Sequence, residues 1–95
     1  MNKYEAMFIL HPSLNEEELV KLKSSIGEEV KKNEGRIEGN KDLGKKKLTF
    51  PIKKQKEGIY HIINFEASPS SIKILKNSYR LNESILRVLI IRREA

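Results

Sequence analysis

The residues of this chain that are best suited to bind a partner are its lysines, which crowd into one stretch. Residues 41–57 hold seven basic and two acidic side chains, and the whole 95-residue chain has 19 Lys and Arg, 13 Asp and Glu and a net charge of +6. Clustered ammonium groups bind phosphate, so this excess predicts an acidic partner, with nucleic acid ahead of an anionic membrane. The alternative is a solvated, lysine-rich loop that only keeps the protein soluble.

Side chains that could perform catalysis are few. His11 and His61 have no cysteine to act with, and they lack the spacing of a metal site. The glutamate pairs at residues 16–17 and 28–29 fit the solvated faces of a helix. No glycine-rich phosphate loop follows a strand. We therefore expect no enzymatic activity, no metal and no cofactor.

Composition also bears on the compartment. The chain has no cysteine, which excludes disulfides and thiol catalysis and fits a reducing cytoplasm. Its apolar runs are only a few residues long, whereas a membrane helix needs about 20. Residues 1–5 lack the pattern of a signal peptide. We expect one soluble, cytoplasmic domain over residues 1–95, with no membrane partner.

The elements that must position the lysines follow from the spacing of apolar residues. The side chains of residues 4–11 alternate between two faces, which predicts a strand. A helix is predicted to begin at Glu16, because Asn15 can cap it and Glu18 can complete a capping box. Gly35 is expected to end this helix in a left-handed conformation.

The lysines themselves fall in a predicted hairpin. Residues 36–52 indicate a long strand with bends at Gly39 and Gly44. The polar residues 53–58 are expected to form the turn, and the β-branched and aromatic residues 59–65 the second strand.

The remaining elements complete a fold class. Ser68 and Pro69 are typical of a helix start, and residues 85–91 are the strongest strand in the chain. The order predicts an α+β, ferredoxin-like βαββαβ fold, in which one four-stranded antiparallel sheet carries both helices on one face. The last strand should lie at an edge of the sheet.

The other face of that sheet is expected to be apolar. Strand alternation places five large apolar side chains on it, namely Met7, Ile9, Ile62, Leu89 and Ile91. Soluble monomers seldom expose such a surface, so it predicts a protein partner. A different strand register or a self-dimer would also account for it.

The strand order also matches RNA-recognition motifs, which stack bases on aromatic residues of the open sheet face. This chain offers only Tyr60 in an outward position there. RNA recognition is therefore expected to depend on phosphate contacts and RNA shape, and not on base stacking across the sheet.

Several motifs lie along the whole chain. They are Tyr4-Glu5, His11-Pro12, Leu43-Gly44-Lys45-Lys46-Lys47-Leu48-Thr49-Phe50-Pro51-Ile52, Gly58-Ile59-Tyr60, Leu81-Asn82-Glu83 and the strand end with Ile85, Arg87 and Ile90-Ile91-Arg92. Taken together, these motifs resemble the bacterial small-subunit ribosomal protein six family. Thr49 departs from the family, which usually has Ala there.

The resemblance implies a ferredoxin-like fold, no enzymatic activity and a structural role in the small ribosomal subunit. It also implies binding to small-subunit ribosomal RNA together with ribosomal protein eighteen. Lys46 and Lys47 match the family's basic pair, and the other cations are chosen from their places in the predicted fold. We expect phosphate contacts from Lys3, Lys46, Lys47, Lys53, Lys54, Lys56, Arg80, Arg87, Arg92 and Arg93. The five apolar residues of the open face are assigned to protein eighteen from strand alternation, and Arg87 could equally pair with a carboxylate of that partner.

Two other functions remain open for a ferredoxin-like chain. A small acylphosphatase-like enzyme would need a catalytic Asn, for which Asn64 or Asn82 could serve, and an arginine-bearing phosphate loop, which does not follow the first strand. A ligand-sensing module would dimerise through the open face.

Overall fold

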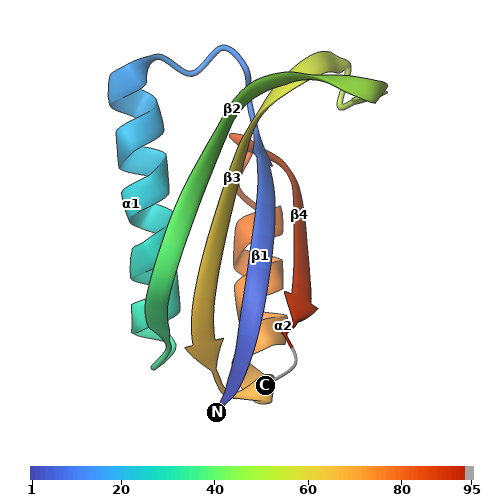
Figure 1. Ribbon diagram of the computed structural model, residues 1–95. Helices are drawn as coiled ribbons and strands as arrows, with labels where there is room; N and C mark the ends of the chain where they lie inside the picture. The colour runs from blue at the N-terminus through green and yellow to red at the C-terminus, as the bar shows by residue number, and fades with distance from the viewer. Residues whose placement is uncertain (94–95) are drawn as a thin grey trace.

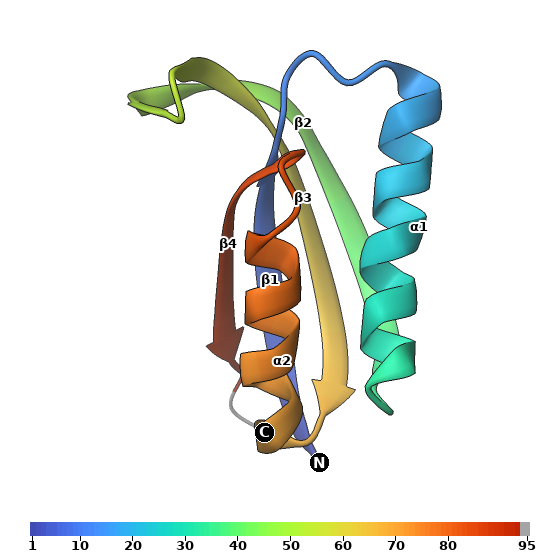
Figure 2. The same ribbon diagram turned by 180° about the vertical axis from the view of Figure 1, so that it is seen from behind.

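A computed structural model describes residues 1–93. Its elements are β1 (Asn2–Leu10), α1 (Glu16–Lys32), β2 (Arg36–Ile52), β3 (Gln55–Ala67), α2 (Pro69–Arg80) and β4 (Ile85–Arg92). The strands form one sheet in the order β2-β3-β1-β4, and every neighbouring pair is antiparallel. Both helices lie on the same face of the sheet (Figures 1 and 2). The predicted ferredoxin-like fold is confirmed, with β4 at one edge and β2 at the other.

The core lies between the helices and the sheet face that they cover. Ala6, Phe8 and Leu10 of β1 are fully buried there. The ring of Phe8 meets the ring of Tyr79 on α2 edge to face, with centroids 4.9 Å apart. The Tyr79 hydroxyl donates a hydrogen bond of 2.7 Å to the Ile26 carbonyl on α1, and its burial raises the pKa of Tyr79. One tyrosine thus joins the sheet and both helices.

The start of α1 is fixed by the predicted capping box. The Glu18 amide donates to the Asn15 side chain at 2.8 Å, and the Asn15 amide donates to the Glu18 carboxylate at 3.0 Å. Two of the amides that a helix start leaves without intrahelical partners are satisfied in this way.

The end of α1 differs from the sequence prediction. Glu34, and not Gly35, adopts the left-handed conformation, with φ at 65°. A Cβ on Gly35 would lie 2.7 Å from Val30 Cγ1 and 2.9 Å from the Glu66 carbonyl oxygen. The prediction of a left-handed stop at Gly35 is therefore wrong, because this glycine is needed for the close approach of the chain to its neighbours.

The hairpin of β2 and β3 bends where the glycines predict. The pairing register shifts just before Gly39 and again just before Gly44, which has φ at 79°. The predicted six-residue turn is wrong, however. Ile52 pairs with Gln55, so the turn consists only of Lys53 and Lys54, whose φ angles are 49° and 68°.

A third irregularity shapes the end of the hairpin. Lys47 pairs with Glu57 and Ile52 pairs with Gln55, so residues 48–51 lie opposite Lys56 alone. Four residues cannot all pair in the ladder with one residue, so this part of β2 bows outward. We call residues 48–51 the arch. Figure 1 shows the end of the hairpin turning sideways beyond the top of the sheet, above β4.

Candidate nucleic-acid and protein interface

The open face of the sheet has an apolar middle. Met7 of β1 lies between Ile62 of β3 and Leu89 of β4 in the two ladders. Leu89 and Ile91 are 48% and 49% exposed. These four predicted partner residues therefore form one band of apolar side chains across three strands, as alternation predicts.

Ile9 does not belong to this exposed band. It lies on the open face but is only 7% exposed. Gly58 packs directly against its side chain, and the arch residue Leu48 lines the same hollow as Ile9, Tyr60 and Arg87. The expectation that Ile9 faces solvent is wrong because the bowed hairpin covers this end of the sheet.

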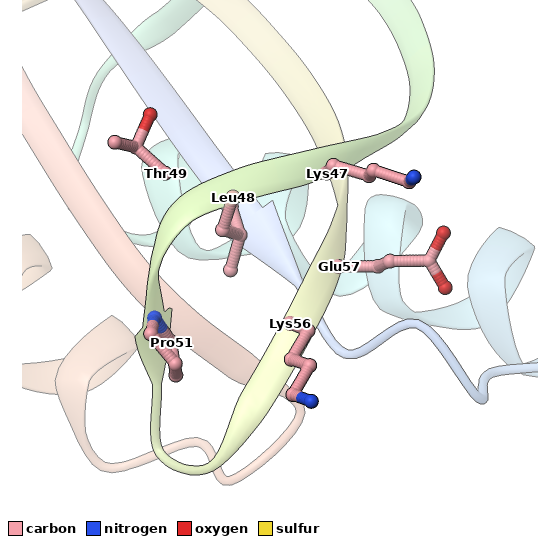
Figure 3. Close-up of a pocket in the computed structure, with 6 residues that line it drawn as sticks. All are labelled: Lys47, Leu48, Thr49, Pro51, Lys56 and Glu57. Atoms are coloured by element: carbon pink, nitrogen blue, oxygen red, sulfur yellow. The ribbon is translucent and has the colours of Figure 1, made fainter.

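The basic pair Lys46 and Lys47 is divided between two faces. Lys46 pairs with Gly58, and its Nζ lies 5.9 Å from the centre of the Tyr60 ring. Lys47 pairs with Glu57, and Figure 3 shows both of these side chains pointing to the same side, away from the interior of the hairpin end. Only Lys46 is directed to the open face, because neighbouring residues of a strand alternate.

Three other cations converge at the hairpin end of the sheet. Lys53 of the turn, Arg80 at the end of α2 and Arg87 of β4 line one hollow of about 330 Å³, whose walls also include Ile85, Leu86 and Val88. Among the described residues, none of the three forms an ion pair with a carboxylate. Like charges gathered without a compensating anion suit a phosphate group. Lys54 and Lys56 are exposed beside them on the same hairpin end.

The remaining predicted cations lie at the opposite end of the sheet. Lys3 and Arg93 both approach the Glu38 carboxylate, at 3.9 Å and 3.7 Å. Arg92 pairs with Tyr4 in the β1–β4 ladder and is exposed. The structure therefore divides the ten cations into a hairpin group of seven and an end group of three, namely Lys3, Arg92 and Arg93.

Comparison with known proteins is decisive for this chain. Residues 3–92 match the family model described as Ribosomal protein S6. The chain belongs to the ribosomal protein S6 family. This confirms the family resemblance, makes the chain a protein of the small ribosomal subunit, and places it in a family that is not known to be enzymatic.

Individual members of the S6 family agree over the whole chain. The small ribosomal subunit protein bS6 of Helicobacter pylori strain Shi470 is 42% identical over 95 residues, and the chain spans about 67% of that relative's length. The bS6 protein of Caldanaerobacter subterraneus is 40% identical over 92 residues, which is 97% of each chain. The crystal structure of 30S ribosomal protein S6 from Thermotoga maritima superposes with a TM-score of 0.91 at 32% identity, covering 97% of this chain and 87% of the other.

This S6-family chain also holds a polar cluster around a buried histidine that sequence reasoning missed. His61 is 3% exposed, and its Nδ1 lies 2.7 Å from Oδ1 of Asp42. Lys23 of α1 approaches the same oxygen at 2.8 Å. The hydrogen bond from Lys23, helped by the one from His61, lowers the pKa of Asp42 despite partial burial. Three elements supply these residues, so no local motif could reveal the cluster.

Two further observations concern residues 1–93. No group of three or more His, Cys, Asp or Glu side chains is arranged to hold a metal ion there. Neither α1 nor α2 combines the length and the apolar character that a helix needs to span a membrane.

Sequence reasoning also missed Phe50 at the centre of the arch. This aromatic side chain is 77% exposed. Leu48, two residues earlier, points into the hairpin end, whereas the adjacent Thr49 points away from it (Figure 3). The sequence does contain a signal for this residue, because Phe50 is an aromatic residue between Lys47 and Lys53.

Proposed function

We propose that this chain is a structural protein that binds small-subunit ribosomal RNA together with ribosomal protein eighteen. The observation that carries the proposal is the adjacency of two surfaces on one small body. The hollow of Lys53, Arg80 and Arg87 adjoins the apolar band, because Arg87 and Leu89 lie two residues apart on β4 and line a common hollow with Met7. A phosphate backbone and an apolar protein surface can thus be bound side by side.

The RNA contact is supported by unpaired positive charge. The cations of the hairpin group are exposed or line an open hollow, and those in the hollow have no carboxylate partner among the described residues. Binding of phosphates by such residues releases counterions, so affinity falls steeply with salt. Lys3 and Arg93 share the Glu38 carboxylate at long distances of 3.9 Å and 3.7 Å, and such ion pairs near the surface are weak enough for a phosphate to compete.

The protein contact is supported by the composition of the open face. Met7, Ile62, Leu89 and Ile91 provide apolar surface on three adjacent strands. Glu5 lies among them, between Asn64 and Ile91 in the two ladders. A basic partner such as a ribosomal protein could bury the apolar band and place a cation against Glu5.

The RNA half of the proposal is tested by charge removal in the hollow. Lys53→Gln combined with Arg80→Gln should weaken binding to small-subunit ribosomal RNA, and the slope of log affinity against log salt should become shallower by about one to two. Lys31→Gln combined with Lys32→Gln removes the same charge from the far end of α1 and is the matched control. Equal slopes for the two double variants would contradict the RNA contact.

The protein half is tested on β4. Leu89→Glu places a charge in the apolar band and should reduce binding of purified protein eighteen by a hundredfold or more, because an unpaired charge would be buried. Ile74→Glu is the control, since Ile74 is similarly exposed, at 54%, but lies on α2 behind the sheet. If Leu89→Glu leaves this binding intact and instead dissolves a homodimer of the free chain, the open face is a self-association surface.

A further inference from the structure

Phe50 is placed where an apolar side chain gains nothing within the fold. It is 77% exposed, and it does not belong to the cluster of buried residues that forms the core. The arch that carries it exists only because β2 has three more residues than β3 can pair between Lys47 and Ile52. The surplus residues lift Phe50 out of the sheet.

A hollow of about 210 Å³ separates the arch from the sheet. Its walls are Leu48, Thr49, Phe50 and Ile52 on the hairpin side, and Ile9, Tyr60 and Arg87 on the sheet side. The lining thus combines apolar and aromatic surface with three polar groups, namely the Thr49 and Tyr60 hydroxyls and the Arg87 guanidinium. A flat, apolar ring with polar edges fits such a lining.

The rim of this hollow is positively charged. The Lys46 ammonium group lies over Tyr60 on one side. On the other side, Arg87 is shared with the hollow that Lys53 and Arg80 complete. Charged residues are depleted in the centres of protein–protein interfaces, whereas an aromatic surface between cations is typical of sites that bind unpaired nucleotides. The surroundings of Phe50 therefore favour RNA over an apolar protein segment.

We propose that the hollow beneath the arch binds one unpaired nucleobase of RNA, stacked on Phe50, while Lys46, Arg87 and Lys53 contact the flanking phosphates. This inference rests on the proposed RNA binding and adds a base contact to it. It also differs from base stacking across the sheet, for which the open face has only Tyr60. The aromatic surface is supplied here by a side chain that the hairpin carries beyond the sheet.

Two RNA hairpins with the same stem test this site. One contains a single bulged 2-aminopurine and the other has that base paired, and both are titrated with the full chain at low salt. The chain should bind the bulged RNA about tenfold more tightly than the paired RNA. The fluorescence of the bulged 2-aminopurine should fall on binding, because stacking on an aromatic ring quenches it.

Substitutions at Phe50 separate stacking from apolar contact. Phe50→Tyr should keep the preference for the bulged RNA and the quenching, whereas Phe50→Leu and Phe50→Ala should lose both. The salt dependence should stay unchanged in all three, because no cation is removed. Val20→Ala, which truncates another exposed apolar side chain on α1, is the control and should behave as the unsubstituted chain.

The outcomes distinguish this site from RNA binding as such. If the chain binds both RNA hairpins equally, with a normal salt slope, the base site is refuted and the phosphate contacts stand. If Phe50→Leu matches the unsubstituted chain, stacking is refuted. If Phe50→Ala weakens only the binding of protein eighteen, the arch is a protein contact and the inference fails. If neither RNA binds at low salt, both proposals fail.

Discussion

Replacing Lys53-Lys54 by Asn-Gly should stabilise the fold and weaken RNA binding at the same time. Both lysines have positive φ angles, 49° and 68°, as the central residues of a two-residue type I′ turn require. Asn and Gly are the residues that adopt this turn most readily, whereas most side chains are strained in it. The natural turn therefore keeps two cations in a conformation that disfavours them.

The size of the stability gain follows from the backbone. An L-residue in the left-handed region destabilises the fold by roughly 1–2 kcal/mol, and a Gly avoids this strain. The greater freedom of Gly in the unfolded chain cancels about 0.5–1 kcal/mol of that benefit. Asn avoids only part of the strain, so we expect the double substitution to stabilise the fold by about 1 kcal/mol in total. For a domain of this size such a gain raises the melting temperature by roughly 4–8 °C. Loss of two possible phosphate contacts should make the salt slope shallower by about 1.5.

Thermal unfolding followed by circular dichroism measures the first effect, and RNA titrations between about 50 and 200 mM salt measure the second. Glu34→Gly provides the control, because Glu34 has the same kind of strain, with φ at 65°, at the distant end of α1. It should raise the melting temperature without making the salt slope shallower. A lower melting temperature for the Asn-Gly variant would refute the strain argument, and an unchanged salt slope would refute the role of the turn in binding RNA.

Two further predictions concern the fold itself. Gly35→Ala should destabilise the chain by about 1–3 kcal/mol, because its Cβ would lie 2.7 Å from Val30 Cγ1. Gly27→Ala places its Cβ with nothing within 4 Å and should stabilise α1 by up to about 1 kcal/mol. Chemical denaturation of both variants measures these changes, and equal effects would exclude the steric explanation. Lys23 and His61 lower the pKa of Asp42, so the ionised Asp42 stabilises the fold above the ordinary carboxyl pKa of 3.8, and this stabilisation is lost as the pH falls through the lowered value. The natural chain should therefore unfold at a higher urea concentration than Asp42→Asn at about pH 5, and this difference in urea midpoint should shrink as the pH falls to about 2. A difference that stays constant across that range would contradict the stabilisation of the fold by ionised Asp42.

Features that depend on neighbouring residues could be predicted from the sequence. The capping box needs only Asn15 and Glu18, three residues apart, and both hydrogen bonds are present. Strand alternation likewise placed Met7, Ile62, Leu89 and Ile91 on one face, because a two-residue period needs no knowledge of the partner strand.

Features that depend on distant segments, or that lack their usual signature residues, could not be predicted. Lys53 and Lys54 lack the Asn-Gly signature of a tight turn, so the sequence predicts a longer turn than the structure has. Neither the burial of Ile9 nor the convergence of Lys53 with Arg80 can be read from the chain, because both depend on how far the arch bends the hairpin. The same bend separates Phe50 from the alternating pattern and left it out of the predicted site.

The irregular path of β2 also bears on how the chain avoids joining copies of itself. A 17-residue strand at the edge of a sheet offers a long row of free backbone groups, which is a template for aggregation. β2 breaks this row with three register shifts, with Pro51, which has no amide hydrogen, and with the lysines at residues 45–47. A second chain would meet interruptions and positive charge wherever it tried to add a strand. The bends that shape the binding hairpin are therefore also the features that keep this edge closed to other sheets.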